Sequence, residues 1–137
     1  MRYLRSLLAF SIWVLASCDR SAAPTALDGY WVHVRAAEEP PGFGLGIVFT
    51  TSDREISGSG TWQGEAGPSG TLTAIGGIEH GTVTLDLTFT QVLNGVPQQG
   101  SFVEHFVGTF TSYDDLEGTT TQNGQTGMLH LHRSAGP

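Results

Sequence analysis

The chain has 137 residues, in which 13 acidic residues outnumber six arginines; it contains no lysine, and its formal net charge is −7. A surface of this charge is repelled by phosphate backbones and by anionic lipid, which argues against nucleic acid as a partner. A chain of this length forms one domain with its own hydrophobic core, and its single cysteine excludes an internal disulfide.

Residues 1–17, MRYLRSLLAFSIWVLAS, have the three-part layout of a secretory signal peptide. Arg2 and Arg5 give a positive start, residues 6–15 are uncharged and mostly apolar, and the small residues Ala16 and Ser17 follow. The apolar run is shorter than the roughly 20 residues that a membrane-spanning helix requires. The pattern therefore favours a cleaved leader over an uncut membrane helix.

The leader ends in Leu15-Ala16-Ser17-Cys18, which resembles the lipobox of bacterial lipoproteins. The resemblance implies that the leader is cut before Cys18, that the thiol receives a diacylglyceryl group, and that the new amino terminus is acylated. The alternative is an ordinary secreted protein in which Cys18 is incidental. We expect a cell-envelope protein that faces the periplasm and is anchored to the lipid bilayer through Cys18. Asp19 favours the inner membrane over the outer one, by a rule that varies between organisms.

Residues 18–27 then comprise the lipidated cysteine and a short tether, because 21–26, SAAPTA, are small and polar with one proline. The β-domain is expected to span 28–137. The mature chain would keep four arginines against all 13 acidic residues, a net charge of −9.

Beyond the tether, apolar and polar residues alternate with the period of two that is typical of β-strands. The clearest example is 82–90, TVTLDLTFT, in which Val, Leu and Phe alternate with Thr and Asp. The same pattern predicts strands at 30–36, 43–51, 55–63, 71–78, 82–90, 101–111, 115–121 and 125–133. Asn123-Gly124 predicts a type I′ hairpin turn, whereas Asn94-Gly95 is expected in a longer connection.

Short strands joined in order by short turns form a meander, and closing the meander removes its exposed edges. We therefore predict an all-β, eight-stranded antiparallel up-and-down barrel; a two-sheet β-sandwich is the alternative. Small residues are expected on the inner face, where they either allow sharp coiling of the strands or leave room for a ligand. They are Gly58, Gly60, Ala74, Gly76, Gly108 and Gly118.

The two ends of the domain carry a further pattern. Gly29-Tyr30-Trp31 opens the first predicted strand, and Arg133 closes the last. This arrangement resembles the calycin barrels, which include lipocalins, avidin-like proteins and related protease inhibitors. The resemblance implies that Gly29, Trp31 and Arg133 form the barrel floor, with the Arg133 guanidinium over the Trp31 indole. The lipocalin Thr-Asp-Tyr turn is missing, and no biotin-binding set is recognisable.

Glu104 lies on the apolar side of its predicted strand, two residues from Phe102 and from Phe106. If that side is the inner one, burial disfavours the ionised carboxylate. His33 shares a face with Trp31 and Arg35, so a pair of Glu104 with a histidine or an arginine would orient the polar head of a ligand. The alternative is a twisted strand that places Glu104 in water. The candidate ligand-binding residues are His33, Phe89, Phe102, Glu104 and Phe106.

Three other patterns are weaker indications of a functional site. His130 and His132 share a strand face, but a zinc site needs at least three protein ligands and no third lies near them in sequence; both are expected to face solvent. The acidic residues at 114–117 lack the ligand spacing of a calcium loop. Gly58-Ser59-Gly60 lacks the helix that follows a nucleophilic serine elbow. We predict no catalytic residue, metal or cofactor.

These patterns lead us to expect a non-catalytic lipoprotein that binds a small apolar or amphipathic ligand in a lipocalin-like barrel. One alternative is a filled barrel that contacts an envelope protein through loops 38–42 and 94–100, as an inhibitor or assembly factor. The other is an enzyme of unknown reaction that uses Glu104 and His105 as acid and base.

Overall fold

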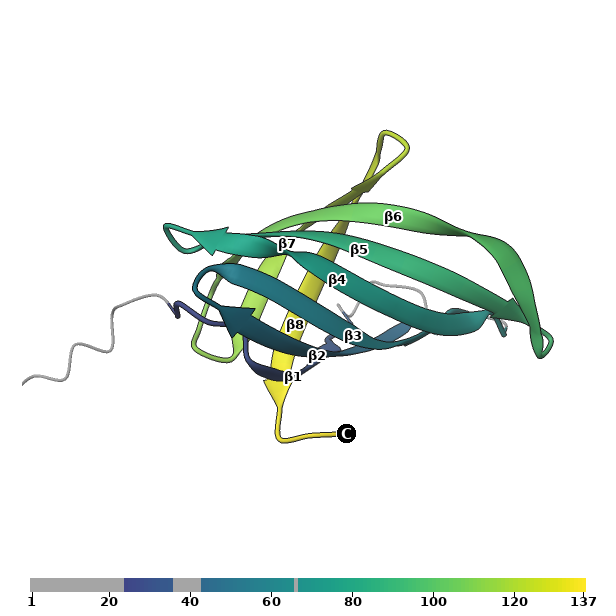
Figure 1. Cartoon of the computed structure of the whole chain (residues 1–137), viewed down its shortest axis with the longest axis horizontal. Helices are drawn as coiled ribbons and strands as arrows, with labels where there is room; N and C mark the ends of the chain where they lie inside the picture. The colour runs from purple at the N-terminus through teal and green to yellow at the C-terminus, as the bar shows by residue number, and fades with distance from the viewer. Residues whose placement is uncertain (1–23, 36–42, 66) are drawn as a thin grey trace, which may run out of the picture.

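The structure is a computed structural model that describes residues 24–35, 43–65 and 67–137. In this part of the chain, eight strands form one closed antiparallel barrel in which each strand pairs with the next and β8 pairs with β1 (Figure 1). They are β1 (Gly29–His33), β2 (Gly44–Ser52), β3 (Glu55–Gln63), β4 (Ser69–Glu79), β5 (Thr82–Leu93), β6 (Val96–Phe110), β7 (Asp115–Gln122) and β8 (Gln125–Ser134). The predicted meander barrel is confirmed.

The connection between β5 and β6 differs from the expectation. Asn94 and Gly95 form a two-residue turn with φ angles of 51° and 77°, as a type I′ hairpin requires. The expected longer connection was wrong because Pro97 lies in β6, where it pairs with Val92. A proline is tolerated there because β6 pairs with β7 only from His105 onward, so this stretch is an edge. Asn123-Gly124 forms the predicted hairpin turn.

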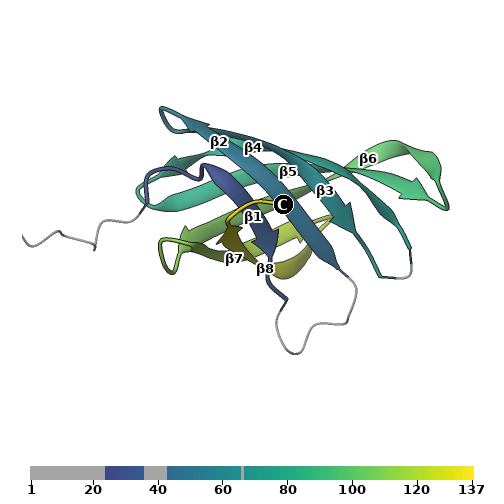
Figure 2. The ribbon, with the colours of Figure 1, turned by 90° about the horizontal axis from the view of Figure 1, so that it is seen from below.

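The barrel has two unlike ends. We call the end at which residues 24–28 enter β1 the floor, and the opposite end the mouth. In both views of the ribbon, the β5–β6 hairpin extends past the other strands at the end away from the N-terminal segment (Figures 1 and 2). Counted from the floor, the pairing of β1 with β8 ends at His33, and the pairing of β6 with β7 ends at His105. The β5–β6 and β7–β8 hairpins therefore separate at the mouth, which is splayed between them.

The hydrophobic core occupies the inside of the barrel, and all eight strands contribute to it. In β5 the alternation is as predicted: Leu87 is fully buried, and its neighbour Thr88 lies on the other face. The buried apolar residues are Leu27, Trp31, Leu45, Ile47, Phe49, Ile56, Trp62, Leu72, Ala74, Ile78, Val83, Leu85, Leu87, Phe89, Phe106, Leu116, Leu129 and Leu131. Most of the barrel is filled with side chains, as is usual for eight strands.

The inner-face glycines allow close packing of the strands. A Cβ atom at Gly76 would lie 2.8 Å from the carbonyl carbon of Thr84 on β5, and one at Gly60 would lie 2.8 Å from the Cα atom of Ile47 on β2. Neither distance leaves space for a side chain. Of the two explanations offered by the sequence, these contacts favour coiling of the strands over room for a ligand.

The floor contains the contact expected between Trp31 and Arg133, which are paired on β1 and β8. The Arg133 Cζ atom lies 4.8 Å from the centroid of the buried Trp31 ring and 4.9 Å from that of Tyr113. The Trp31 indole donates a 2.8 Å hydrogen bond to the Leu27 carbonyl. Gly29 has a φ of 115°, which other residues rarely adopt. These contacts tie the entering chain to the last strand.

Several predictions fall on parts of the chain outside the described residues. They include the leader, Cys18 and the loop at 38–42. Within the described ranges, no helix has the length and apolar character needed to cross a membrane.

Candidate functional site: a cavity at the barrel mouth

A cavity of about 180 Å³ opens at the mouth. Residues of six strands and of the segment before β2 line it: His33, Phe43, Leu45, Leu87, Phe89, Glu104, Thr120, Met128 and Leu129. Apolar cavities of roughly 150 Å³ accommodate a benzene-sized molecule. The cavity thus has room for one ring or a short chain, while the barrel beneath it is packed.

Glu104 places a carboxyl group in the wall of this cavity. It lies opposite Leu87 in the pairing of β5 with β6, and Leu87 is fully buried. Glu104 is therefore on the inner face, and the alternative that turned it into water does not hold. Burial raises the pKa of the Glu104 carboxyl above its ordinary value of 4.5, and a hydrogen bond with the Thr120 side chain opposes the shift. Its ionised form is thus poorly solvated inside the barrel.

His33 and Phe89, two further predicted residues, also line the cavity. His33 is the last residue of β1, and its ring meets the ring of Phe43 edge-on at a centroid distance of 5.3 Å. The cavity therefore combines an imidazole, a carboxyl and a hydroxyl with an aromatic and aliphatic wall. Such a combination can orient the polar head of a ligand while covering its apolar body.

Phe102 and Phe106 are not among the residues that line the cavity. Phe102 stacks flat on Phe89, with ring centroids 4.8 Å apart, and Trp62 contacts both rings edge-on. Phe106 is fully buried in the core. The expectation that these two residues contact a ligand is not supported, because one packs behind the wall and the other beneath it.

Thr120 is the polar residue of the cavity that the sequence analysis missed. Leu116, Gly118 and Thr120 alternate along β7, and the first of them is fully buried. Because Leu116 marks the inner face, that alternation carries enough information to place Thr120 inside the barrel. The contributions of Leu45 and Met128 depend on how distant strands meet at the mouth, which no single strand pattern reveals.

The proposed acid–base pair of the enzyme alternative is not formed. His105 follows Glu104 in β6, so the two side chains point to opposite faces of the strand. The Nδ1 atom of His105 lies 2.8 Å from the Asp86 carboxylate on the outside of the barrel. Glu104 and His105 therefore do not share a site.

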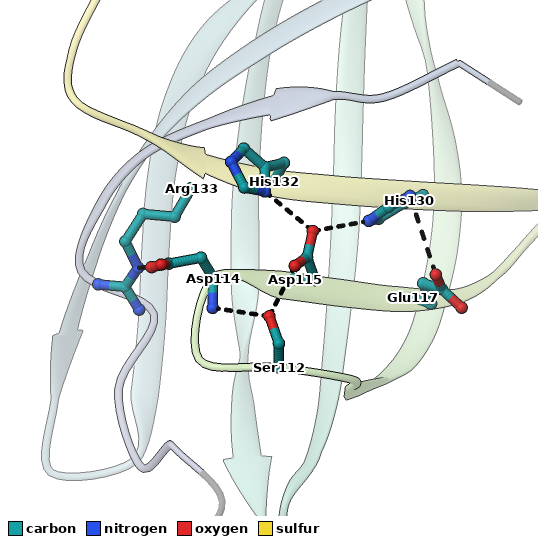
Figure 3. Close-up of polar contacts among 7 residues, drawn as sticks. All are labelled: Ser112, Asp114, Asp115, Glu117, His130, His132 and Arg133. Atoms are coloured by element: carbon teal, nitrogen blue, oxygen red, sulfur yellow. Dashed lines mark hydrogen bonds and ion pairs between the residues drawn. The ribbon is translucent and has the colours of Figure 1, made fainter.

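A second polar cluster lies on the outer surface near the floor, where Asp115 sits between two histidines (Figure 3). The Asp115 Oδ1 atom is 2.9 Å from His132 Nδ1 and 3.0 Å from His130 Nε2. The Ser112 hydroxyl donates a 2.6 Å hydrogen bond to the other oxygen. These contacts, with that of Ser112 the strongest, lower the pKa of Asp115 from 3.8 to about 2.

The cluster ties β7 to β8 and does not resemble a metal centre. Among the described residues, no group of three or more histidine, cysteine, aspartate or glutamate side chains is arranged to hold a metal ion. The histidines share an outer face as expected, but the sequence did not show their partner, because Asp115 meets them only through the pairing of β7 with β8.

The lowered pKa of Asp115 predicts a pH-dependent contribution to stability. Its carboxylate favours the folded state above about pH 4, and this contribution is lost as pH falls through about 2. The melting temperature of Asp115→Asn should therefore lie below that of the parent protein near neutral pH, and the gap should narrow toward pH 2. Thermal melts over this range check it, with the exposed Glu55→Gln as control. A gap that does not change with pH would contradict the assignment.

Comparisons of the chain with family models, with curated proteins and with solved structures found no match. A functional proposal therefore rests on the geometry of the mouth cavity.

Proposed function

We propose that this protein is a lipid-anchored, non-catalytic binding protein of the bacterial cell envelope, and that it holds a small amphipathic molecule in the mouth of its barrel. The observation that carries the proposal is the Glu104 carboxyl in the wall of a cavity whose other lining residues are mostly apolar. A barrel that served only as a filled scaffold would be more stable with an apolar side chain there, because a desolvated carboxyl disfavours folding. Groups held in such environments are concentrated at functional sites.

The size of the cavity limits the ligand. With about 180 Å³ available, a single ring or a short alkyl chain fits between Leu45, Phe89 and Leu129. Any longer part of the molecule would leave through the splayed mouth, between the β5–β6 and β7–β8 hairpins. We therefore expect a ligand with a small apolar end and a polar group within reach of Glu104, His33 and Thr120.

The anchor is proposed on the lipobox at residues 15–18. Residues 24–28 lead into β1 at the floor, next to the buried Leu27, so the mouth lies at the opposite end of the domain from the point where the proposed tether joins it. This arrangement favours entry of the ligand from the periplasm. Asp19 supports retention at the inner membrane.

Replacing Cys18 by serine is expected to remove the lipid attachment, because the hydroxyl does not accept the diacylglyceryl group in place of the thiol. We predict that Cys18→Ser is either released from the membrane fraction or left with its leader uncut. Cell fractionation and the mass of the purified chain distinguish these outcomes from the parent. A normally cut Cys18→Ser protein that stays in the membrane fraction would contradict the lipoprotein proposal.

The cavity is tested by filling it. In the lipidated protein reconstituted in nanodiscs, 2-phenylethanol should bind and shift the NMR signals of residues at the mouth. Leu45→Phe puts a larger side chain into the cavity and should abolish binding, whereas Val48→Phe adds the same ring on the outer face of β2 and should leave it unchanged. Equal binding by both variants, or no binding by the parent, would count against a ligand site.

A filled barrel that acts by protein contact is the second candidate. It is supported by the β5–β6 hairpin, whose tip exposes Leu93 at 41% and Val96 at 59%. Replacing both by serine should weaken membrane retention of a partner protein if this candidate is correct. The same double replacement should leave 2-phenylethanol binding intact if the cavity is the functional site.

A further inference from the structure

We infer that the ligand of the mouth cavity is an organic cation, with an ammonium group that meets Glu104 and a small apolar body that fills the space beneath it. This inference rests on the proposed function and adds the chemical class of the ligand. Its three supports are the charge inside the cavity, the nature of the wall and the charge of the whole chain.

The cavity contains an acid and no permanent cation among the residues that line it. Of the arginines in the described part, Arg54 lies in a turn at the floor and Arg133 contacts Trp31. Arg35 lines an adjoining groove, which shares His33, Met128 and Leu129 with the cavity, but Arg35 is not among the residues that line the cavity itself. Glu104 and His33 are the titratable groups of the wall. An ammonium group at this point would supply the opposite charge that a partly desolvated carboxylate lacks.

The raised pKa of Glu104 agrees with this account, since burial and not an acidic neighbour is its main cause. A cationic ligand would stabilise the ionised form and reverse the effect of burial. An anionic head group would instead lie against the ionised Glu104 carboxylate in a poorly solvated cavity, where the two like charges repel each other.

The wall suits an organic cation better than a metal ion. Phe43 and Phe89 present aromatic rings to the cavity, and their neighbours Leu45 and Leu87 are aliphatic. Ammonium groups are attracted to aromatic faces, and the attraction is strongest where water is excluded. Hard metal ions require several oxygen ligands, which this wall does not offer.

The charge of the whole chain acts in the same direction. The mature protein would carry four arginines and no lysine against 13 acidic residues. The resulting negative potential concentrates cations near the surface and repels anions. This long-range attraction of cations acts over the whole surface and does not select one site, so the test must separate it from the contact with Glu104.

The experiment compares three molecules that share a phenylethyl body: phenethylamine, the neutral 2-phenylethanol and the anionic 3-phenylpropanoate. Binding is measured by calorimetry to the lipidated protein in phosphatidylcholine nanodiscs at pH 7. We expect the amine to bind about tenfold more tightly than the alcohol, as one charge-assisted contact provides, and the carboxylate to bind more weakly than both. In Glu104→Gln the amine should lose this preference, so that the variant binds the amine no more tightly than the alcohol.

Glu79→Gln is the matched control, because Glu79 is an exposed acid at the floor end of β4 and the variant makes the same change in net charge. It should leave the preference for the amine intact. Equal affinity for amine and alcohol in the parent, a preference that survives Glu104→Gln, or an equal loss in Glu79→Gln would overturn the inference and leave the cavity proposal standing. Failure of all three molecules to bind would overturn both.

Discussion

Leu87→Ala is expected to destabilise the barrel by about 2–5 kcal/mol, the usual range for truncating a buried leucine. Leu87 is fully buried and lies between Ala74 on β4 and Glu104 on β6. Ala74 is too small to move into the vacated volume, and Glu104 gains nothing from a larger apolar cavity. The loss should therefore lie in the upper part of this range. Denaturant unfolding measures it.

Thr88→Ala is the matched control, because Thr88 is the next residue in β5 and points to the outer face. Its removal should cost no more than about 0.5 kcal/mol, as for most surface substitutions. Similar losses of unfolding free energy in Leu87→Ala and Thr88→Ala would mean that the inner and outer faces of β5 are assigned incorrectly. The assignment of Leu87 and Phe89 to the cavity wall would then be wrong as well.

Glu104→Lys is expected to be the second large effect, with a loss of about 1–3 kcal/mol. The lysine is longer than the glutamate, and its ammonium group would have to be desolvated in a wall of apolar side chains or drawn out through the mouth. The hydrogen bond with Thr120 would also be lost. Thermal melts compare the variant with the parent, and a melting temperature within error of the parent would place Glu104 outside the cavity.

Glu104→Gln separates charge from shape. Because burial raises the pKa of Glu104, ionisation of the folded protein costs stability as pH rises above the ordinary value of 4.5. The amide does not ionise, so the melting temperature of Glu104→Gln relative to the parent should increase with pH across this region. An unchanged difference would show that the carboxyl is well solvated.

The fold could be predicted from the sequence because the information lies in local alternation. Residues 82–90 alternate without interruption. The contact between Trp31 and Arg133, on two strands that become neighbours only when the barrel closes, was expected from a family resemblance and not from this alternation. The β5–β6 hairpin was misjudged because Pro97 breaks a central strand but not an edge.

The candidate site could be predicted only in part. The inward direction of Glu104 follows from its own strand, and the structure places His33 in the same cavity. Phe102 shares the inner face but packs behind Phe89, and Asp115 meets His132 only through strand pairing. Side-chain packing and register between strands are set by the closed barrel, so a residue's own neighbours in sequence do not contain them.

Native mass spectrometry of the lipidated protein, isolated with its host membrane lipids and without detergent, tests most directly whether the mouth cavity holds a ligand. We expect a small non-covalent adduct, additional to the lipid anchor, on the parent protein and on Val48→Phe, and its absence from Leu45→Phe. No adduct on the parent, or the same adduct on Leu45→Phe as on Val48→Phe, would contradict it.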